Sequence, residues 1–391
     1  MKSEWTKKKL SDIADFNPRE AIKKGAIAKK IPMDVLRPFY RDIPYYVEEC
    51  FSGGTKFRNG DTIMARITPC LENGKTAQVS ILNDGEVGFG STEYIVFRAK
   101  EGIADKDYLY YLVCSPEVRE PAIKSMVGSS GRQRVQTDVV KNLEIDVPPL
   151  VEQEKIGSFL KAFDDKIALN DRINKNLEQQ AQTLFDHFYD CLSGQACTLS
   201  EIIDIRDGTH DSPKATDNGY PLVTSKHLLP FGVDTSSANI ISKADYDKVN
   251  ERSNVNTGDI LISMIGTVGL ISYVIDSPVE FAIKNVGLFK TSQHPSLDLY
   301  ILYYLKSIST THHIERCLAG STQKYISLGE LRKLPILVPS QQELDVYNSV
   351  VRPIVSEIIL LVQENRRLSN IRDLLLPKLM TGELDVFDID L

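Results

Sequence analysis

Two stretches of the chain repeat apolar residues at alternating spacings of four and three. The first follows Pro148-Pro149, with apolar residues at Ile156, Leu160, Phe163, Ile167, Leu177, Ala181, Leu184 and Phe188. The second follows Pro339, with apolar residues at Leu344, Tyr347, Val351, Ile354, Ile358, Leu361 and Leu368, continued by Ile371, Leu374 and Leu375. This spacing is typical of a helix that packs along another helix. It predicts two long helices, over 148–193 and 339–380, each about 60 Å long at about 1.5 Å per residue.

Asparagine occupies three inward positions of these stripes: Asn170 and Asn174 in the first stretch and Asn365 in the second. A buried asparagine in a coiled coil fixes register and partner, because it is satisfied only opposite another polar group. We expect the two helices to pair antiparallel through these residues; frayed or hydrated positions are the alternative. Pro353 lacks a backbone donor, so it should kink the second helix or mark where its regular part begins.

The two halves of the chain repeat one another at an offset near 190 residues. The matched segments are KLSDIADFN with TLSEIIDIR, GDTIMARI with GDILISMI, YLYYLVCS with YILYYLKS, and GRQRV with STQKY. Such self-similarity indicates a duplicated structural unit. We therefore predict one globular domain over 1–147 and a second over 194–338, each followed by a long helix, with a tail over 381–391.

Each predicted domain mixes strands and helices. The β-rich runs are 62–67, 94–97, 260–265 and 286–289, and they lie among Gly, Asn and Asp turns. One helix in each half contains the stripe YLYYL or YILYYL, whose spacing favours core packing. The sequence thus predicts an α+β fold, in which two similar mixed α/β domains are separated by two long antiparallel coiled-coil helices with pseudo-twofold symmetry.

The net charge of −7 argues against a nucleic-acid binder only until its distribution is considered. The stretches 149–193 and 340–391 have net charges of −3 and −4, whereas 1–148 is +2 and 194–339 is −2. The acidic excess therefore lies mainly in the predicted helices. Near-neutral domains can still bind DNA through local basic loops, so the net charge neither establishes nor excludes it.

Familiar catalytic motifs are missing from the sequence. There is no Asn/Asp-Pro-Pro-aromatic tetrad of the kind with which amino-methyltransferases hold a flipped base, and GSSGRQR lacks the Lys-Ser/Thr of a phosphate-binding loop. HExxH, a nucleophile elbow and CxxC pairs are also absent. The beginning of the chain has no apolar leader, and no apolar run reaches the roughly 20 residues of a membrane span. We expect a non-catalytic cytoplasmic protein that binds no metal and no membrane.

Polar loops flanked by glycine recur in both halves and hold the side-chain types that contact DNA. In the first half the candidates are Arg66, Thr68, Asn73, Lys75, Arg132, Gln133 and Arg134. In the second half they are Thr209, His210, Asp211, Thr267, Lys284, Asn285, Ser321, Thr322, Gln323, Lys324 and Tyr325. Arg or Lys suits guanine, Asn or Gln suits adenine, and hydroxyl groups suit phosphate. Each loop alone could be an ordinary turn, but recurrence in both halves favours DNA binding.

Together these features resemble the DNA-specificity subunit of type I restriction–modification systems. The residues behind the resemblance are PPLVEQEKIGSFL, LEQQAQTLF, IRDGTHDSP, ARITPCLENGK, GSTQKYIS and LLLPKLMTGELDV, in a duplicated arrangement of domain and helix. The resemblance covers essentially the whole chain. The first half departs from it in having GSSGRQR where the second has GSTQKYIS.

The resemblance implies two target-recognition domains that read a bipartite site in double-stranded DNA and are held apart by the paired helices. It also implies two adenine methyltransferase subunits docked on the helices, and helicase-nuclease subunits that join for cleavage. The cofactors S-adenosylmethionine, ATP and magnesium would then belong to these partners, and none to this chain. The alternative from another class is a coiled-coil scaffold whose end domains bind proteins or glycans.

Overall fold

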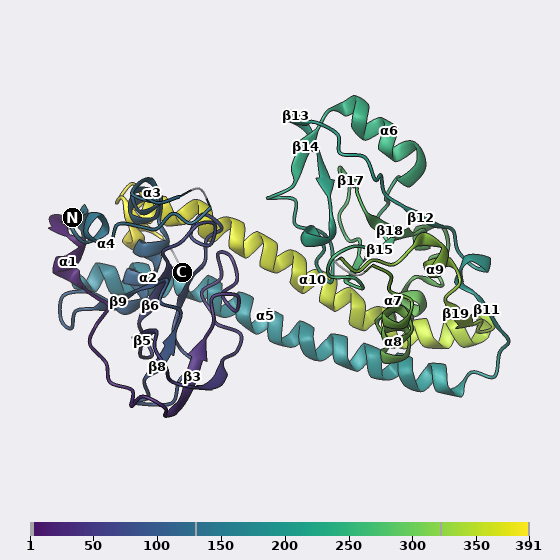
Figure 1. Cartoon of the computed structure of the whole chain (residues 1–391), viewed down its shortest axis with the longest axis horizontal. Coiled ribbons are helices and arrows are strands. Elements are labelled where there is room, and N and C mark those ends of the chain that lie inside the picture. The colour runs from purple at the N-terminus through teal and green to yellow at the C-terminus, as the bar shows by residue number, and fades with distance from the viewer. Residues whose placement is uncertain (1–3, 130, 321–322, 390–391) are drawn as a thin grey trace. The chain divides into compact units, whose positions relative to one another are not determined.

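A computed structural model describes residues 4–129, 131–320 and 323–389 of the chain (Figure 1). It divides into two compact units. Unit 1 consists of residues 1–170 and 364–391, and unit 2 of residues 171–363. Unit 1 is therefore built from two separate parts of the chain, whereas unit 2 is continuous. Each unit contains one mixed α/β domain and a segment of both long helices.

The first part of unit 1 runs from β1 to the first half of the long helix α5. Its elements are β1 (Thr6–Lys9), α1 (Leu10–Ile13), β2 (Ala14–Phe16), β3 (Ile27–Ile31), β4 (Val47–Cys50), β5 (Thr55–Phe57), β6 (Thr62–Ala65), β7 (Thr76–Gln78), β8 (Gly88–Gly90), β9 (Tyr94–Ala99), α2 (Lys106–Cys114), α3 (Pro116–Lys124), α4 (Thr137–Lys141), β10 (Glu144–Val147) and α5 (Leu150–Cys191). The strands form sheets of order β2-β9-β6-β7, β4-β3-β8-β5 and β1-β10.

Unit 2 begins within α5 and ends within the second long helix, α10. Its elements are β11 (Ala196–Thr198), η1 (Leu199–Glu201), β12 (Ile205–Asp207), β13 (Ala215–Val223), η2 (Ser225–His227), β14 (Asn239–Ile241), α6 (Lys243–Ser253), β15 (Ile260–Ser263), β16 (Ile271–Tyr273), β17 (Ala282–Ile283), β18 (Val286–Phe289), η3 (Thr291–Gln293), α7 (Asp298–Lys306), α8 (Ile308–Arg316), α9 (Leu328–Arg332), β19 (Pro335–Leu337) and α10 (Gln341–Met380). The strands form sheets of order β12-β18-β15-β16, β14-β13-β17 and β11-β19. The short helix η4 (Val386–Asp388) follows α10 in unit 1.

The two units repeat the same order of elements, as the sequence predicted. The sheet β2-β9-β6-β7 of unit 1 corresponds to β12-β18-β15-β16 of unit 2, and helices α2, α3 and α4 correspond to α7, α8 and α9. The predicted β-rich runs are strands β6, β9, β15 and β18. The duplication is therefore structural as well as sequential.

A buried aspartate forms an ion pair at the same position of the equivalent sheets β2-β9-β6-β7 and β12-β18-β15-β16. In unit 1, Arg98 donates to both carboxylate oxygens of Asp61 at 2.7 Å, and in unit 2, Lys290 donates to Asp259 at 2.5 Å. Both aspartates belong to the Gly-Asp turn of the repeated GDTIMARI and GDILISMI segments. The aspartate of the repeated turn thus pairs with a basic side chain in both units.

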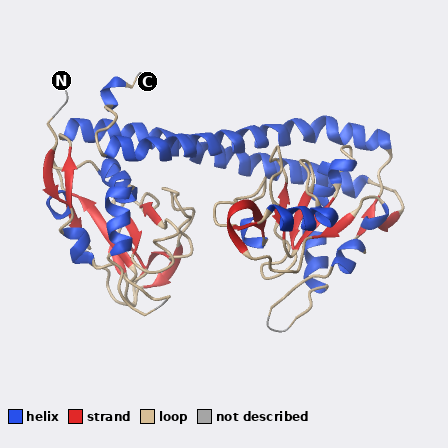
Figure 2. Cartoon of the chain, turned by 90° about the horizontal axis from the view of Figure 1, so that it is seen from above, coloured by secondary structure: helices blue, strands red, loops and turns tan. Residues whose placement is uncertain are grey.

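The tyrosine-rich helices lie in the core, which confirms the prediction of core packing. Helix α2 is completely buried from Tyr108 to Val113, and α7 from Asp298 to Leu305. In unit 2, Tyr300 packs among the rings of the long helices, with Phe185 at 5.6 Å and Tyr347 at 6.3 Å between ring centroids. These helices therefore join each sheet to the long-helix pair, which runs along one side of each unit (Figure 2).

In unit 1 the long helices pair through polar as well as apolar residues. The amide nitrogen of Asn170 donates to Asn365 Oδ1 at 2.8 Å and to Glu364 Oε2 at 2.7 Å. Both asparagines are buried, Asn170 completely. A few residues away, Arg372 of α10 pairs with Asp164 of α5, so numbering rises along one helix as it falls along the other. The pairing within unit 1 is therefore antiparallel.

In unit 2 the long helices pair through apolar and aromatic residues. The shared core includes Ala181 and Phe185 of α5 with Tyr347, Val351 and Val355 of α10, all of them buried. Asn174, the third predicted pairing residue, lies in unit 2 and is partly buried there. The predicted stripes omitted Phe159 and Phe185, two of the buried aromatic residues of α5.

The second stripe differs from its prediction in two details. Helix α10 begins at Gln341 and continues through Pro353, so the proline does not mark the start of regular helix; the predicted kink, the other alternative, stays a prediction. The buried Val351 and Val355 on either side hold this segment in the core. The apolar stripe does not continue through Ile371 and Leu374, which are 45% and 69% exposed. Arg372 takes the buried position instead, because Asp164 faces it. Within the described part of the chain, no helix is long and apolar enough to cross a membrane.

Candidate functional site

Predicted site residues gather at one end of the sheet β2-β9-β6-β7 in unit 1 and of the equivalent sheet β12-β18-β15-β16 in unit 2, which we call the polar sheet end. In unit 1 it is the end where β2 and β6 finish and β9 begins. Residues 127–129 and 131–134 of one loop close over it, because Arg134 forms antiparallel bridges with both Val127 and Ile67. This loop contains the predicted residues Arg132, Gln133 and Arg134, and brings them next to Arg66 and Thr68.

Glu93 is the centre of the polar sheet end in unit 1. Arg134 donates to its carboxylate from Nε at 2.9 Å and from Nη2 at 2.7 Å. Arg66 lies on the other side, with its Nε 4.0 Å from Glu93 Oε2. The hydrogen bonds from Arg134 lower the pKa of Glu93, against its partial burial, which raises it. Glu93 is therefore ionised at neutral pH, hydrogen-bonded to the Arg134 guanidinium and close to that of Arg66.

The other predicted residues of unit 1 have different environments. Lys75 donates to the carbonyl oxygen of Met33 at 2.9 Å and is only partly exposed, so its ammonium group is occupied within the domain. Thr68 contributes its backbone nitrogen to the carbonyl oxygen of Gln133 at 3.0 Å, which ties the loop to the sheet. Arg132 is exposed and Gln133 partly exposed. Asn73 lies in the turn before Lys75 and is also exposed.

Unit 2 has the same polar sheet end, where β12 and β15 finish and β18 begins. Thr209 and Lys284 form a parallel bridge there, and the backbone of Asn285 adopts a positive φ of 54°. Lys284 Nζ donates to Ser212 Oγ at 2.5 Å. The segments that the sequence singled out as RDGTHDSP and AIKNVG thus lie next to each other.

His210 connects these two segments. Its Nε2 is 3.0 Å from Asp207 Oδ2 and its Nδ1 is 2.8 Å from Asn285 Oδ1. The imidazole is 61% exposed, whereas the Asp207 carboxylate is 5% exposed. The other oxygen of Asp207 pairs with Arg252. His210 is therefore fixed by a buried carboxylate and in turn orients the amide of Asn285.

Residues 319–320 and 323–325 close the polar sheet end of unit 2. Tyr325 bridges to both Ala319 and Ile265, and the backbone nitrogen of Gly266 donates to Lys324 O at 3.1 Å. Gln323, Lys324 and Tyr325 are exposed. Thr267 is exposed too, and its carbonyl oxygen accepts from Ser263. The predicted residues Ser321 and Thr322 lie outside the described residues.

Both loops depend on a glycine at the same position. Gly128 and Gly320 have φ angles of 139° and 93°, in the region that favours glycine. A Cβ at Gly128 would lie 2.9 Å from the carbonyl oxygen of Arg132, and one at Gly320 would lie 2.3 Å from that of Gln323. The chain thus folds back on itself at each glycine, where a side chain would meet the backbone.

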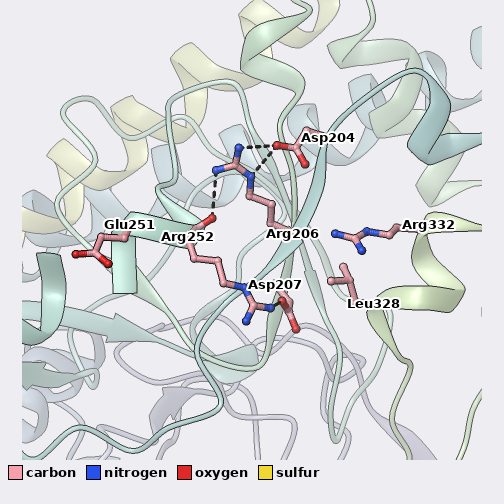
Figure 3. A pocket seen from close by; sticks show the side chains of 7 residues that line it. All are labelled: Asp204, Arg206, Asp207, Glu251, Arg252, Leu328 and Arg332. Carbon is pink, nitrogen blue, oxygen red and sulfur yellow. Dashed lines mark hydrogen bonds and ion pairs between the residues drawn. The ribbon is translucent and has the colours of Figure 1, made fainter. Parts of the chain in front are cut away.

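A pocket next to the polar sheet end of unit 2 contains several charged residues that the sequence analysis missed (Figure 3). Its lining is Asp204, Arg206, Asp207, Glu251, Arg252, Leu328 and Arg332. Arg206 pairs with Asp204 at 2.6 Å, and Arg332 donates to the carbonyl oxygen of Ile205 at 2.8 Å. Three arginines balance three acids here, so the lining holds the end of strand β12 rather than providing a positive surface.

Glu93 and Asp207, the two carboxylates that orient the polar side chains, were also missed. Glu93 directly precedes strand β9 and Asp207 is the last residue of β12, but an acidic residue gave no signal of binding DNA. Among residues 4–129, 131–320 and 323–389, no three His, Cys, Asp or Glu side chains are grouped so as to hold a metal ion. The geometry of both polar sheet ends is suited to binding, with exposed donors fixed by buried acceptors.

Comparison with known families agrees with this duplicated arrangement. Residues 2–179 and 195–351 match the family model described as the type I restriction modification DNA specificity domain. The chain belongs to this family. Its two matches fall on the two repeated parts of the sequence, and the predicted resemblance to type I specificity subunits is confirmed.

Curated relatives are named as specificity subunits of type I restriction enzymes. The EcoAI specificity subunit of Escherichia coli is 30% identical over 228 residues, which cover 57% of this chain but 37% of that subunit. The MjaIX specificity subunit of Methanocaldococcus jannaschii is 26% identical over 314 residues, 74% of this chain and 71% of the relative. The HindI specificity subunit of Haemophilus influenzae is 22% identical over 406 residues, 84% of this chain and 87% of the relative.

A solved structure shares the fold. The crystal structure of a type I restriction-modification S subunit from M. genitalium matches with a TM-score of 0.52 at 15% identity, covering 97% of this chain and 96% of that chain. The predicted fold class, with two similar mixed α/β domains and two long helices packed together, is confirmed. The comparisons assign no function to individual residues, so the residues proposed to contact DNA remain predictions.

Proposed function

We propose that this specificity subunit reads a bipartite target in double-stranded DNA, one half-site with each unit. The observation that carries the proposal is the pair of polar sheet ends. They share one backbone frame, closed by a glycine-dependent loop, yet they present different side chains. A repeated frame with unlike side chains is suited to two different half-sites, because base-edge contacts depend on the donors and acceptors presented.

In this proposal the chain recognises DNA and leaves the chemistry to partner subunits in the cytoplasm. Base methylation requires a pocket for a flipped base, and the sequence has no motif for one. Two adenine methyltransferase subunits would dock on the long helices and use S-adenosylmethionine. Helicase-nuclease subunits would add ATP- and magnesium-dependent cleavage. What supports these partners is the family to which the chain belongs.

Methylation mapping tests this function directly. Adenine methylation is mapped across a genome that encodes the chain and its methyltransferase partner, before and after deletion of the chain's gene. We expect methylation at one bipartite sequence to disappear with the gene and to return when the gene is restored. Methylation that persists at every site would contradict the proposal. The purified chain alone should transfer no methyl group to the same DNA.

A pair of lysine variants tests where the DNA binds. Lys324→Ala removes an exposed cation from the loop that closes the polar sheet end of unit 2. We expect weaker binding and a shallower dependence on salt, since each lost phosphate contact lowers the salt slope by about one. Lys248→Ala is the matched control, because Lys248 is an exposed residue of α6 in the same unit. Equal affinities and salt slopes for the two variants would contradict this placement of the DNA.

A further inference from the structure

Three positions of the polar sheet ends are equivalent in the two units. In unit 1, Ala65 of β6 lies opposite Tyr94 of β9, and in unit 2, Ser263 of β15 lies opposite Val286 of β18. These two cross-strand pairs are equivalent. Arg66, which follows β6, is thus equivalent to Met264, which follows Ser263 of β15. Glu93, which precedes β9, is equivalent to Asn285, which precedes β18. The bridges from the closing loops add Arg134 and Tyr325 as the third pair.

Backbone hydrogen bonds confirm this alignment. Val135 donates its backbone N–H to Arg66 O at 2.8 Å, and Ile326 donates to Met264 O at 2.9 Å. Arg134, which precedes Val135, is therefore held against the end of β6, and Tyr325, which precedes Ile326, against the end of β15. One frame thus carries Arg66, Glu93 and Arg134 in unit 1, and Met264, Asn285 and Tyr325 in unit 2.

In unit 1 this frame fixes one guanidinium group and leaves part of it free. Glu93 accepts from Nε and Nη2 of Arg134, and no hydrogen bond of the described residues uses its Nη1. The Arg134 side chain is 46% exposed, whereas Glu93 is 23% exposed. The carboxylate therefore occupies the Nε–Nη2 side of the guanidinium group, and the Nη1–Nη2 edge of this partly exposed side chain is left for another acceptor.

A guanidinium edge held in this way matches the major-groove edge of guanine. Guanine presents two acceptors there, O6 and N7, and arginine donates to both of them in the commonest base-specific contact. Orienting the side chain before DNA arrives lowers the entropy lost on binding. Arginine can bind phosphate through the same two-pronged edge, but such a contact would carry no base preference.

The same positions in unit 2 are uncharged. Met264 is 4% exposed and lies in the core, and Tyr325 is 44% exposed. Asn285 replaces the glutamate, and its Oδ1 already lies 2.8 Å from His210 Nδ1. The side-chain amide of Asn285 is therefore already engaged by His210. Unit 2 cannot present the arginine edge that unit 1 presents at this place.

We propose that Arg134, oriented by Glu93, reads a guanine in the half-site bound by unit 1. The three equivalent positions then set part of the difference between the two half-sites. This inference rests on the proposed function, since it names the base that one of the proposed reading ends recognises. Glu93 is a positioning residue in it, whereas Arg134 touches the DNA.

The test is selection of preferred sequences from a DNA library in which both half-sites are randomised. The assembled complex of the chain with its methyltransferase partner is used, because it is the form proposed to bind DNA. Wild-type complex should select a guanine at one position of the first half-site. With Arg134→Ala that position should accept all four bases, affinity for the guanine-containing site should fall tenfold or more, and the second half-site should stay unchanged.

Two further variants separate base reading from a phosphate contact and from a purely structural ion pair. Arg134→Lys keeps the charge but loses the two-pronged edge, so it should also lose the guanine preference. Glu93→Gln keeps Arg134 but removes the carboxylate that orients its side chain. This variant should therefore weaken the guanine preference without abolishing it. Lys7→Ala, at an exposed residue of β1 outside the polar sheet end, is the control and should select the wild-type sequence.

The outcomes distinguish the two proposals. If the wild-type complex selects no bipartite sequence, the proposed function itself fails. If it does, but Arg134→Ala selects the same first half-site, the assignment of Arg134 is wrong and the function stands. Uniformly weaker binding to all sequences by Arg134→Ala, with wild-type binding by Arg134→Lys, would show a phosphate contact. Melting temperatures are measured for each variant, so that binding is compared only between folded proteins.

Discussion

The helix pair of unit 1 and the helix pair of unit 2 are built from the same two helices with different chemistry. Helices α5 and α10 begin at Leu150 and Gln341, so residues 191 positions apart are equivalent. In unit 1, Asp164 and Arg372 form an ion pair whose side chains are 6% and 9% exposed. Their equivalents in unit 2 are Val355 and Ala181, which are buried among apolar residues. A duplicated pairing has thus become ionic in one unit and aliphatic in the other.

This difference shows that the ion pair is not needed for two such helices to associate. Burying two charges costs hydration energy that their attraction only partly offsets, so a buried ion pair adds little stability compared with a well-packed apolar pair. Its removal on one side only is costly, because the other charge stays buried. Asp164 also accepts a hydrogen bond from Tyr111 at 2.5 Å, which ties the tyrosine helix α2 to this pair. The ion pair of unit 1 therefore favours one relative arrangement of helices α2, α5 and α10 over others.

The largest effect should come from breaking this ion pair on one side. Arg372→Met should lower the free energy of unfolding of unit 1 by about 3–5 kcal/mol, because Asp164 is left buried without its cation. Denaturant unfolding followed by tryptophan fluorescence measures it, since Trp5 lies in unit 1 and packs against the same core. The double variant Asp164→Val/Arg372→Met, which makes unit 1 resemble unit 2, should recover at least half of the loss. A double variant no more stable than the single one would show that the ionic chemistry itself is required.

A smaller effect should distinguish the units by their response to acid. Glu20 in unit 1 accepts from Arg58 and Arg98 at 2.7 Å, and its pKa is lowered to about 2, chiefly by the hydrogen bond from Arg58. A carboxylate with a lowered pKa stabilises the folded state above its unfolded pKa of about 4.5, and this contribution is lost as the pH falls toward 2. Glu20→Gln should therefore destabilise unit 1 by about 2–3 kcal/mol at pH 6.

The measurement is the difference in unfolding free energy between wild type and Glu20→Gln from pH 6 down to the lowest pH at which both fold. We expect that difference to shrink below about pH 4.5, because wild-type Glu20 begins to take up a proton there in the unfolded state. Glu49→Gln serves as the control, since Glu49 forms an exposed pair with Lys30 in the same unit. A difference that stays constant with pH would contradict the assigned electrostatic role of Glu20.

The smallest effect should come from the asparagine pair. Asn170→Leu should cost unit 1 about 1–3 kcal/mol, because Asn365 and Glu364 lose the donor that they share. The equivalent of Asn170 in unit 2 is Leu361, so leucine itself is compatible with this position of the helix pair. Adding Asn365→Leu should remove most of the cost in thermal unfolding. A double variant with additive losses would mean that the two asparagines act independently.

Much of the fold could be predicted because it follows from periodic patterns. The stripe from Ile156 to Phe188 predicted α5, and the matched GDTIMARI and GDILISMI segments predicted the equivalent strands β6 and β15. These signals are local, since each residue contributes through its own polarity and spacing. The repeat added the one long-range inference, that the two halves share an architecture.

The remaining features depend on contacts between distant residues, which no spacing rule contains. Arg372 is buried only because Asp164 faces it from another helix, so the apolar Ile371 and Leu374 turn outward. Lys75 was predicted at the site, yet it is occupied by a carbonyl oxygen 42 positions earlier in the chain. Glu93 was overlooked for the same reason, because its importance comes from the arginines that fold against it.

The division of unit 1 between two parts of the chain determines the order in which the protein can complete its domains during translation. Ile156 and Leu160 share a core with Leu379, Met380 and Val386, which are synthesised more than 200 residues later. At about 5–20 residues per second, the first domain waits on the order of 10–40 s for this covering segment. Unit 2 is continuous and is complete at residue 363, before that segment has been made. The domain whose synthesis begins first is therefore the last to close, and its unfinished core is the part of the nascent chain most exposed to aggregation and to chaperones.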